Sequence, residues 1–336
     1  MSREIDWTRL SIDADVTAVL TWVYETGGSR LTALYENAKA AQWNATTDID
    51  WTIDLPYGSP LPDGSDLARR SFLSSPLGDR GRAGWDEFRW EVQGWTVSQF
   101  LHGEQAAMVA SARLAELLPN IDAKYYAISQ AGDEARHTEA FARYVDLQIP
   151  EPYPLSPALK ALFTDALSAS SWDITAIAIQ SLVEPIALAG FRMAGSTFHD
   201  DLVKRIVAKI AQDEARHVSF GVLLLNEALR ELTSAELASR EEFVLEAVSL
   251  MRTRFLMAEV WERFGVPVSD GTAFAAVDPG LSAFRRTLFS RLVPMLAHIG
   301  LLTPRVVDGL TRMDLLDRAA VRTVRRVLEE TGVSNR

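Results

Sequence analysis

Apolar residues recur at helical spacing along several long stretches of the chain. The clearest is 86–118, where Leu101, Ala107 and Leu114 fall on one stripe. Strand-like alternation is almost absent. The pattern therefore predicts an all-α fold with a four-helix core and flanking helices. The core helices are expected at 86–118, 121–147, 172–195 and 199–232. Other helices are expected at 17–24, 30–42, from 156 to about 168, 233–264, 281–299 and 304–330.

Proline and glycine mark the breaks between these helices. They predict loops at 48–66 and 265–280 and a crossover at 149–154. Ser156 followed by Pro157 is typical of a helix start, and Thr233 to Glu236 resembles a capping box. We expect three parts of one domain. They are an N-terminal irregular and helical extension at 1–85, the core at 86–232, and C-terminal flanking helices at 233–336.

A repeated pentapeptide interrupts the apolar stripes with charge. Asp-Glu-Ala-Arg-His occurs at 133–137 and again at 213–217, and a further Glu lies 30 residues before each repeated Glu. Those earlier residues are Glu104 and Glu184, and the two units are offset by 80 residues. The spacing fits a duplicated helix hairpin and is too long for a solenoid repeat.

The spacing also predicts a metal site. Glu and His at i and i+3 point the same way from a helix, and two such helices together with two helices that each supply one Glu can build a two-metal carboxylate site. Four carboxylates and two imidazoles would neutralise two divalent ions and suit iron or manganese better than zinc. The predicted ligands, and thus the catalytic residues, are Glu104, Glu134, His137, Glu184, Glu214 and His217.

The remaining charged residues of the repeat are expected to support these ligands. Asp133 and Asp213 should accept the free imidazole N–H of the His in the other half. Arg136 and Arg216 should pair with these carboxylates. Pro185 should either kink its helix at the metal or simply break it.

An exposed helix face with charge pairs is the alternative interpretation of the repeat. One copy alone would leave the two interpretations even. The duplication and the apolar neighbours of Glu184 favour the metal site, because an unliganded carboxylate there would be costly to bury.

Composition narrows the functional classes. The chain has 336 residues, is 48% hydrophobic and carries a net charge of −11, which argues against a nucleic-acid partner. It has no cysteine, which excludes disulfides, iron–sulfur clusters and thiolate catalysis. We see no signal region or membrane-spanning run, and expect a cytoplasmic protein without a membrane partner.

These residues resemble the ferritin-like di-iron carboxylate superfamily over about 86–232. The oxygen-activating branch is most similar, including bacterial multicomponent monooxygenase hydroxylases and the small subunit of ribonucleotide reductase. Three positions depart from known patterns. Phe141 stands where the reductase has a radical tyrosine, Leu188 where hydroxylases have a threonine, and Ile210 where N-oxygenases often have a seventh ligand.

The resemblance implies an O2-activating di-iron oxidase or monooxygenase. Hydroxylation, N-oxygenation and desaturation of a small organic substrate remain open, with two iron ions or a Mn/Fe pair and O2 as co-substrate. An external electron donor (a reductase or ferredoxin) and a homodimer are also expected. The alternatives are a ferroxidase or metal-handling protein, and a radical protein, which Phe141 disfavours. The predicted pocket residues are Phe100, Ala107, Met108, Ser111, Phe141, Gln180 and Leu188.

Overall fold

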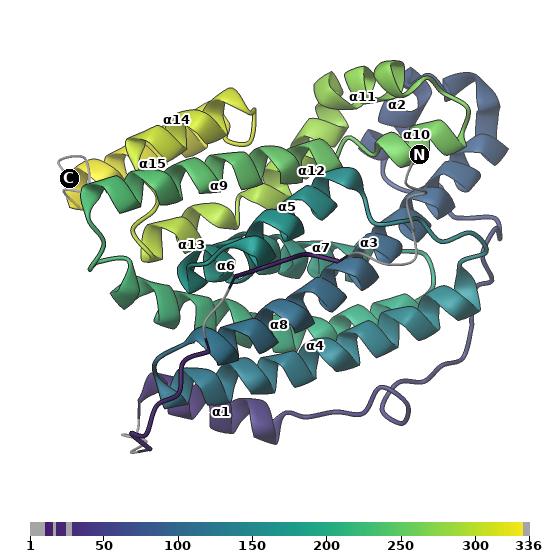
Figure 1. The fold of residues 1–336 in the computed structure, drawn as a ribbon. Helices are drawn as coiled ribbons and strands as arrows, with labels where there is room; N and C mark the ends of the chain where they lie inside the picture. The colour runs from purple at the N-terminus through teal and green to yellow at the C-terminus, as the bar shows by residue number, and fades with distance from the viewer. Residues whose placement is uncertain (1–10, 16–17, 25–28, 332–336) are drawn as a thin grey trace, which may run out of the picture.

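The computed structural model describes residues 11–15, 18–24 and 29–331, and it confirms the all-α prediction (Figure 1). The described residues contain no strand. The helices stack in layers from α1 (Arg30–Ala40), at the bottom of Figure 1, through the core, to α14 (Pro304–Arg312) and α15 (Arg318–Thr331) at the upper left.

Four long helical segments build the core. They are α3 (Gly81–Leu117), α4 (Ile121–Gln148), the segment α6–η2–α7 (Trp172–Thr197) and α8 (Asp201–Ala228). Helix α3 packs along α4 and α7 packs along α8, and contacts between α4 and α8 join the two hairpins of the repeat. Asn120 and Asp200 cap α4 and α8 by accepting hydrogen bonds from the backbone N–H groups of Ala123 and Val203.

The third core segment changes its winding just before Glu184. It consists of α6 (Trp172–Ala176), a π-helical segment η2 (Ile177–Val183) and α7 (Glu184–Thr197). Pro185 has no N–H, and its ring would clash with the carbonyl four residues earlier in an α-helix. The wider π-turn relieves that clash without ending the helix. At Pro185, where a kink or a break was predicted, the chain instead changes from a π-helix to an α-helix.

The other helices cover the core. Helix α1 packs on α4 and α8, and α5 (Pro157–Ser168) packs on α9 (Ser234–Arg254). Thr233 and Glu236 form the predicted capping box. The remaining elements are α2 (Asp66–Ser74), η1 (Gly78–Arg80), α10 (Ala258–Arg263), α11 (Val268–Val277), α12 (Pro279–Phe289) and α13 (Leu292–His298).

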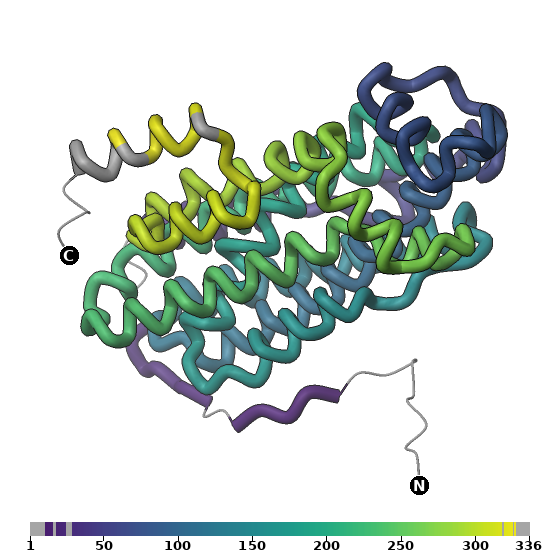
Figure 2. Tube along the Cα trace, turned by 90° about the horizontal axis from the view of Figure 1, so that it is seen from above, coloured from purple at the N-terminus to yellow at the C-terminus, as the bar shows by residue number. Residues whose placement is uncertain are grey.

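Several predicted boundaries were wrong. Residues 18–24 have no regular structure and run along the outside of the bundle (Figure 2), while Thr17 lies outside the described residues. The helix predicted at 233–264 ends at Arg254, because Met257 adopts a left-handed φ of 56°. Asp314, with a φ of 59°, similarly separates α14 from α15, and the helix predicted at 281–299 is divided into α12 and α13.

The loop predicted at 265–280 was also wrong, since α11 occupies most of it. Gly271, in the middle of α11, sits directly against the Trp261 ring. A Cβ at this position would lie 2.2 Å from Trp261 Cγ. Close packing, and not backbone freedom, requires glycine here.

One described helical stretch, Trp172–Thr197, is long and apolar enough to span a membrane by length and composition. Within the fold, 78% of its most apolar window is buried. Its hydrophobicity is accounted for by its place in the bundle core.

Candidate metal centre

Six side chains from the four core segments meet in the middle of the bundle. They form two groups of possible metal-binding residues, and in each group the ligand atoms lie within 4.8 Å of one another. Both groups contain Glu134 and Glu214, so these two carboxylates lie between the two halves. All six side chains are buried: Glu104, Glu134, His137, Glu184, Glu214 and His217.

His137 joins the first group to the opposite half of the bundle. Its Nδ1 lies 3.0 Å from Glu104 Oε2 and 3.3 Å from Glu214 Oε1. Its Nε2 lies 3.0 Å from Asp213 Oδ2. Burial alone would lower the pKa of His137, but the hydrogen bonds with Asp213 and Glu104 raise it well above its usual range.

His217 has the same arrangement in the second group. Its Nδ1 lies 3.1 Å from Glu134 Oε1 and 3.3 Å from Glu184 Oε2, and its Nε2 lies 3.2 Å from Asp133 Oδ2. Each Asp of the repeat therefore contacts the imidazole of the other half. Arg136 pairs with Asp133 in the same helix, and Arg216 pairs with Asp213.

The four glutamates have strongly different proton affinities. Burial raises the pKa of Glu104 and of Glu184 well above the usual range. Burial acts in the same direction on Glu134, but the charge of His217 and the hydrogen bond from the His137 imidazole outweigh it and hold the pKa of Glu134 well below that range. Four adjacent carboxylates therefore cannot all be ionised at neutral pH unless cations accompany them.

The donor set fits a pair of metal ions. Glu184 Oε2, Glu214 Oε1 and His217 Nδ1 are buried atoms without a hydrogen-bond partner, and all belong to the second group. Buried polar atoms are normally paired, so such a group needs a ligand. Mixed carboxylate and imidazole ligands with two shared carboxylates suit iron or manganese. The alternative of an exposed helix face disagrees with the burial of all six side chains.

Three residues near the cluster were missed by sequence reasoning. Gln130 donates from Nε2 to Glu184 Oε1 at 2.7 Å. Trp43 donates from its indole N–H to Asp213 at 2.7 Å, and Gln42 donates to Asp133 at 3.0 Å. Gln130 lies one turn before Glu134, which was an available signal. No spacing in the sequence connects residues 42 and 43 to the repeat.

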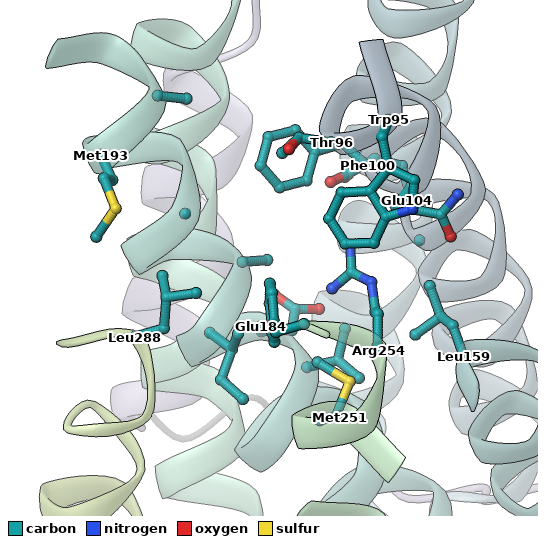
Figure 3. Close-up of a pocket in the computed structure, with 18 of the residues that line it drawn as sticks. Trp95, Thr96, Phe100, Glu104, Leu159, Glu184, Met193, Met251, Arg254 and Leu288 are labelled. Carbon is teal, nitrogen blue, oxygen red and sulfur yellow. The ribbon is translucent and has the colours of Figure 1, made fainter. Parts of the chain in front are cut away.

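An apolar cavity of about 170 Å³ opens directly onto the cluster (Figure 3). Its wall includes the four glutamates at 104, 134, 184 and 214. Helices α3 and α7 supply one part of the apolar wall, and α9 and α12 supply another. The apolar wall includes Phe100, Ala187, Gly190, Met251, Phe255 and Leu288.

Only two predicted pocket residues, Phe100 and Ala107, line this cavity. The cavity-facing stripe of α7 runs through Ala187 and Gly190, so Leu188 points elsewhere. The π-turn directs Gln180 toward Gln130, 3.2 Å away. The other predicted residues outside the wall are Met108, Ser111 and Phe141, and Phe141 packs among aromatic rings instead.

Comparisons with known proteins agree with this architecture. A search of curated proteins gave no match. A solved R2-like ligand-binding oxidase with an aerobically reconstituted Fe/Fe cofactor, a variant protein, is 16% identical. Its TM-score is 0.54, and the match covers 81% of this chain and 94% of that chain. Another variant, with an anaerobically reconstituted Mn/Fe cofactor, is 18% identical with a TM-score of 0.51 and the same coverage. Sequence identities this low are informative about the fold alone, and the two structures confirm that the fold is ferritin-like.

The family comparison extends from fold to activity. The family model described as p-aminobenzoate N-oxygenase AurF matches residues 106–300. That range is more than half of the chain and includes both copies of the repeat. The match confirms the prediction of an O2-dependent oxidoreductase. The chain belongs to the family of p-aminobenzoate N-oxygenase AurF.

Proposed function

We propose that the protein is a dinuclear-metal oxygenase that adds oxygen to a small organic molecule bound in the cavity. The observation that carries the proposal is the opening of an apolar cavity onto the four buried glutamates. Among the three reactions left open, the family match favours N-oxygenation. N-oxygenases often have a seventh metal ligand at the position of Ile210. The side chain of Ile210 is buried and apolar, so this chain differs from those N-oxygenases at that position.

The six cluster residues are the proposed metal ligands. Glu104 and His137 would hold one ion, Glu184 and His217 the other, and the two shared glutamates would reach both. Two iron ions, or one manganese and one iron, supply when bound the electrons and Lewis acidity with which O2 is activated.

The chain's own residues prepare this site. Asp213 holds the His137 proton at Nε2, which leaves Nδ1 as the nitrogen that faces the cluster. Asp133 does the same for His217. Gln130 fixes Glu184 through its amide N–H. The apolar cavity wall excludes water, which strengthens electrostatic interactions within the site.

The proposed reaction also requires an electron donor. The chain contains no cysteine for an iron–sulfur cluster, so electrons would come from an external reductase or ferredoxin. A homodimer and a cytoplasmic location remain predictions from the sequence.

Anaerobic loading with Fe(II), followed by isotopically labelled O2, a reductant and p-aminobenzoate, tests the reaction. We expect two irons per chain and labelled oxygen on the amine nitrogen. A Glu184→Ala variant should lose both results, while Glu116→Ala, on the same bundle but outside the cluster, should keep them. Two-iron protein that consumes O2 without labelling this amine would contradict the proposed reaction.

A further inference from the structure

The cavity contains one positive charge that the metal centre does not use. Arg254, in the last turn of α9, lines the cavity and is only 8% exposed. Figure 3 shows its guanidinium reaching into the pocket beside Trp95, on the side where Glu104 and Glu184 lie. The guanidinium carbon is 5.4 Å from the Trp95 ring centroid and 4.8 Å from that of Phe255.

This guanidinium has no anionic partner in the part of the chain that the structure describes. Its Nε is buried without a hydrogen-bond partner, and no carboxylate lies within ion-pair distance. Glu259 is the carboxylate whose charge acts on it, but Glu259 accepts a hydrogen bond from the Trp95 indole at 3.2 Å. A buried charge without a partner is costly, so it indicates a function.

The other polar side chains of the wall are already engaged. Thr96 donates to the Val92 carbonyl, and Thr197 donates to the Met193 carbonyl. Gln99 donates to the Pro154 carbonyl and accepts from the backbone N–H of Ser156. Outside the carboxylate cluster, Arg254 is thus the described polar group of the wall that remains available to a ligand.

The charges of the site point to an anion at Arg254. Two divalent ions would balance the four glutamates, and the arginines of the repeat already pair with its aspartates. Arg254 then contributes a positive charge without a direct ion-pair partner within an apolar wall. A carboxylate matches the planar guanidinium, which can donate two parallel hydrogen bonds.

The backbone next to Arg254 supports a specialised role. Three residues later, Met257 adopts a left-handed conformation that is rare for residues other than glycine, and it also lines the cavity. The turn it creates ends α9 and places Arg254, Phe255 and Met257 together in the wall.

We propose that Arg254 determines substrate specificity by binding the carboxylate of an organic molecule whose apolar body faces the glutamate cluster. A cavity of about 150 Å³ can hold benzene, so the volume of about 170 Å³ suits a body of about one ring. The proposal rests on the proposed function, because the metal ions must balance the glutamates.

Calorimetric titration of full-length, anaerobic Fe(II)-loaded protein tests this role with two probes, benzoate and the neutral benzamide. Wild-type protein should bind benzoate more tightly. Arg254→Met should weaken benzoate binding on the order of 10- to 100-fold while leaving benzamide binding nearly unchanged. Arg254→Lys should retain part of the preference. Arg192→Met, which removes an exposed arginine on α7, should behave as wild type.

Three results would overturn the role of Arg254. They are a wild-type protein without preference for benzoate, an Arg254→Met variant with unchanged benzoate affinity, and an equal loss of both probes in Arg254→Met. The iron content of each sample separates this test from that of the metal centre. Iron-free protein would contradict the assignment of the metal ligands. Iron-loaded protein with one of the three results would contradict only the proposed role of Arg254.

Discussion

Each cluster histidine is held from two sides by residues of both halves of the chain. The glutamates lie at Nδ1, and an aspartate from the opposite copy of the repeat lies at Nε2. Such contacts fix the orientation and tautomer of a ligand imidazole. They also explain why Asp is present in both copies of the pentapeptide.

Replacing Asp213 by Asn should therefore weaken metal binding without unfolding the protein. The His137 ring would lose its carboxylate acceptor, and we expect the affinity for Fe(II) to fall by roughly 10- to 100-fold. Equilibrium iron titration measures this change. Asp165→Asn, which removes an exposed carboxylate of α5, provides the matched control. An unchanged affinity in Asp213→Asn would show that the contact has no role in binding.

His199 gives a prediction about pH and stability. Burial, with a smaller contribution from the charge of Arg89, lowers its pKa from 6.5 to about 4. Between about pH 4 and 6.5, His199 therefore carries a proton in the unfolded chain and not in the folded chain. The free energy of unfolding should fall as the pH drops from about 6.5 to 4. The effect on the free energy of unfolding is at most about 3 kcal/mol, because solvent screens the partly exposed ring.

Urea unfolding of wild-type protein and His199→Gln at pH 7, 5 and 4 checks this assignment. The variant lacks the titrating ring, so its stability relative to wild type should rise as the pH is lowered. Parallel stability curves for the two proteins would refute the assignment. His199 also contacts the Trp90 ring at a centroid distance of 5.3 Å, so the comparison concerns the slope with pH and not the absolute stability.

Local spacing accounts for what could be predicted among the residues. The positions of Glu, His and Asp within one helix follow from its period, and the duplication indicates that the two copies face each other. Gln42, Trp43 and Arg254 depend on contacts between distant segments, which no helical period encodes.

At the scale of elements, starts of helices were easier to predict than their ends. Thr233 and Ser156 carry local capping signals, and both prove to be caps. The end of α9 depends on the left-handed Met257, and α11 depends on the packing of Gly271 against Trp261. Both are tertiary effects that override local propensity.

The π-turn in η2 depends on equally close packing against α8. A Cβ at Gly221 would lie 2.6 Å from Gln180 Cβ and 3.1 Å from the Gln180 backbone oxygen. We expect Gly221→Ala to displace η2 and to lower the free energy of unfolding by about 1 to 3 kcal/mol.

Gly132→Ala is the control for this prediction, because Gly132 is an exposed helical position with no heavy atom near the added methyl group. It should raise the stability by about 0.5 to 1 kcal/mol. Chemical denaturation compares the two variants. Equal effects of the same sign would show that η2 is not packed tightly against α8.

At the scale of the whole molecule, the C-terminal helices complete the cavity above the four-helix core. Helix α9 contributes Met251 and Arg254 to the wall, Phe255 follows directly after it, and α12 contributes Leu288. A protein that only stores or oxidises metal needs no apolar cavity of ring size. The cavity thus favours the oxygenase over the ferroxidase alternative. The division of the chain at residues 85 and 232 remains a prediction.

Filling the cavity should separate metal binding from substrate oxygenation. In Ala187→Phe, the added ring would occupy the space beside the glutamates. We expect two irons per chain and at least a tenfold lower yield of labelled product, on the order of the cost of excluding a bound ring. Leu188→Phe, at the next position but outside the wall, should retain the yield. Similar yields in both variants would contradict the assignment of the cavity.

The central claim is that the six cluster residues hold two metal ions. Anomalous diffraction at the iron edge, from crystals of the Fe(II)-loaded protein, tests it most directly. The account predicts two peaks within the bundle core. One should contact Glu104 and His137, the other Glu184 and His217, with Glu134 and Glu214 reaching both. A single peak, or peaks away from these side chains, would contradict it.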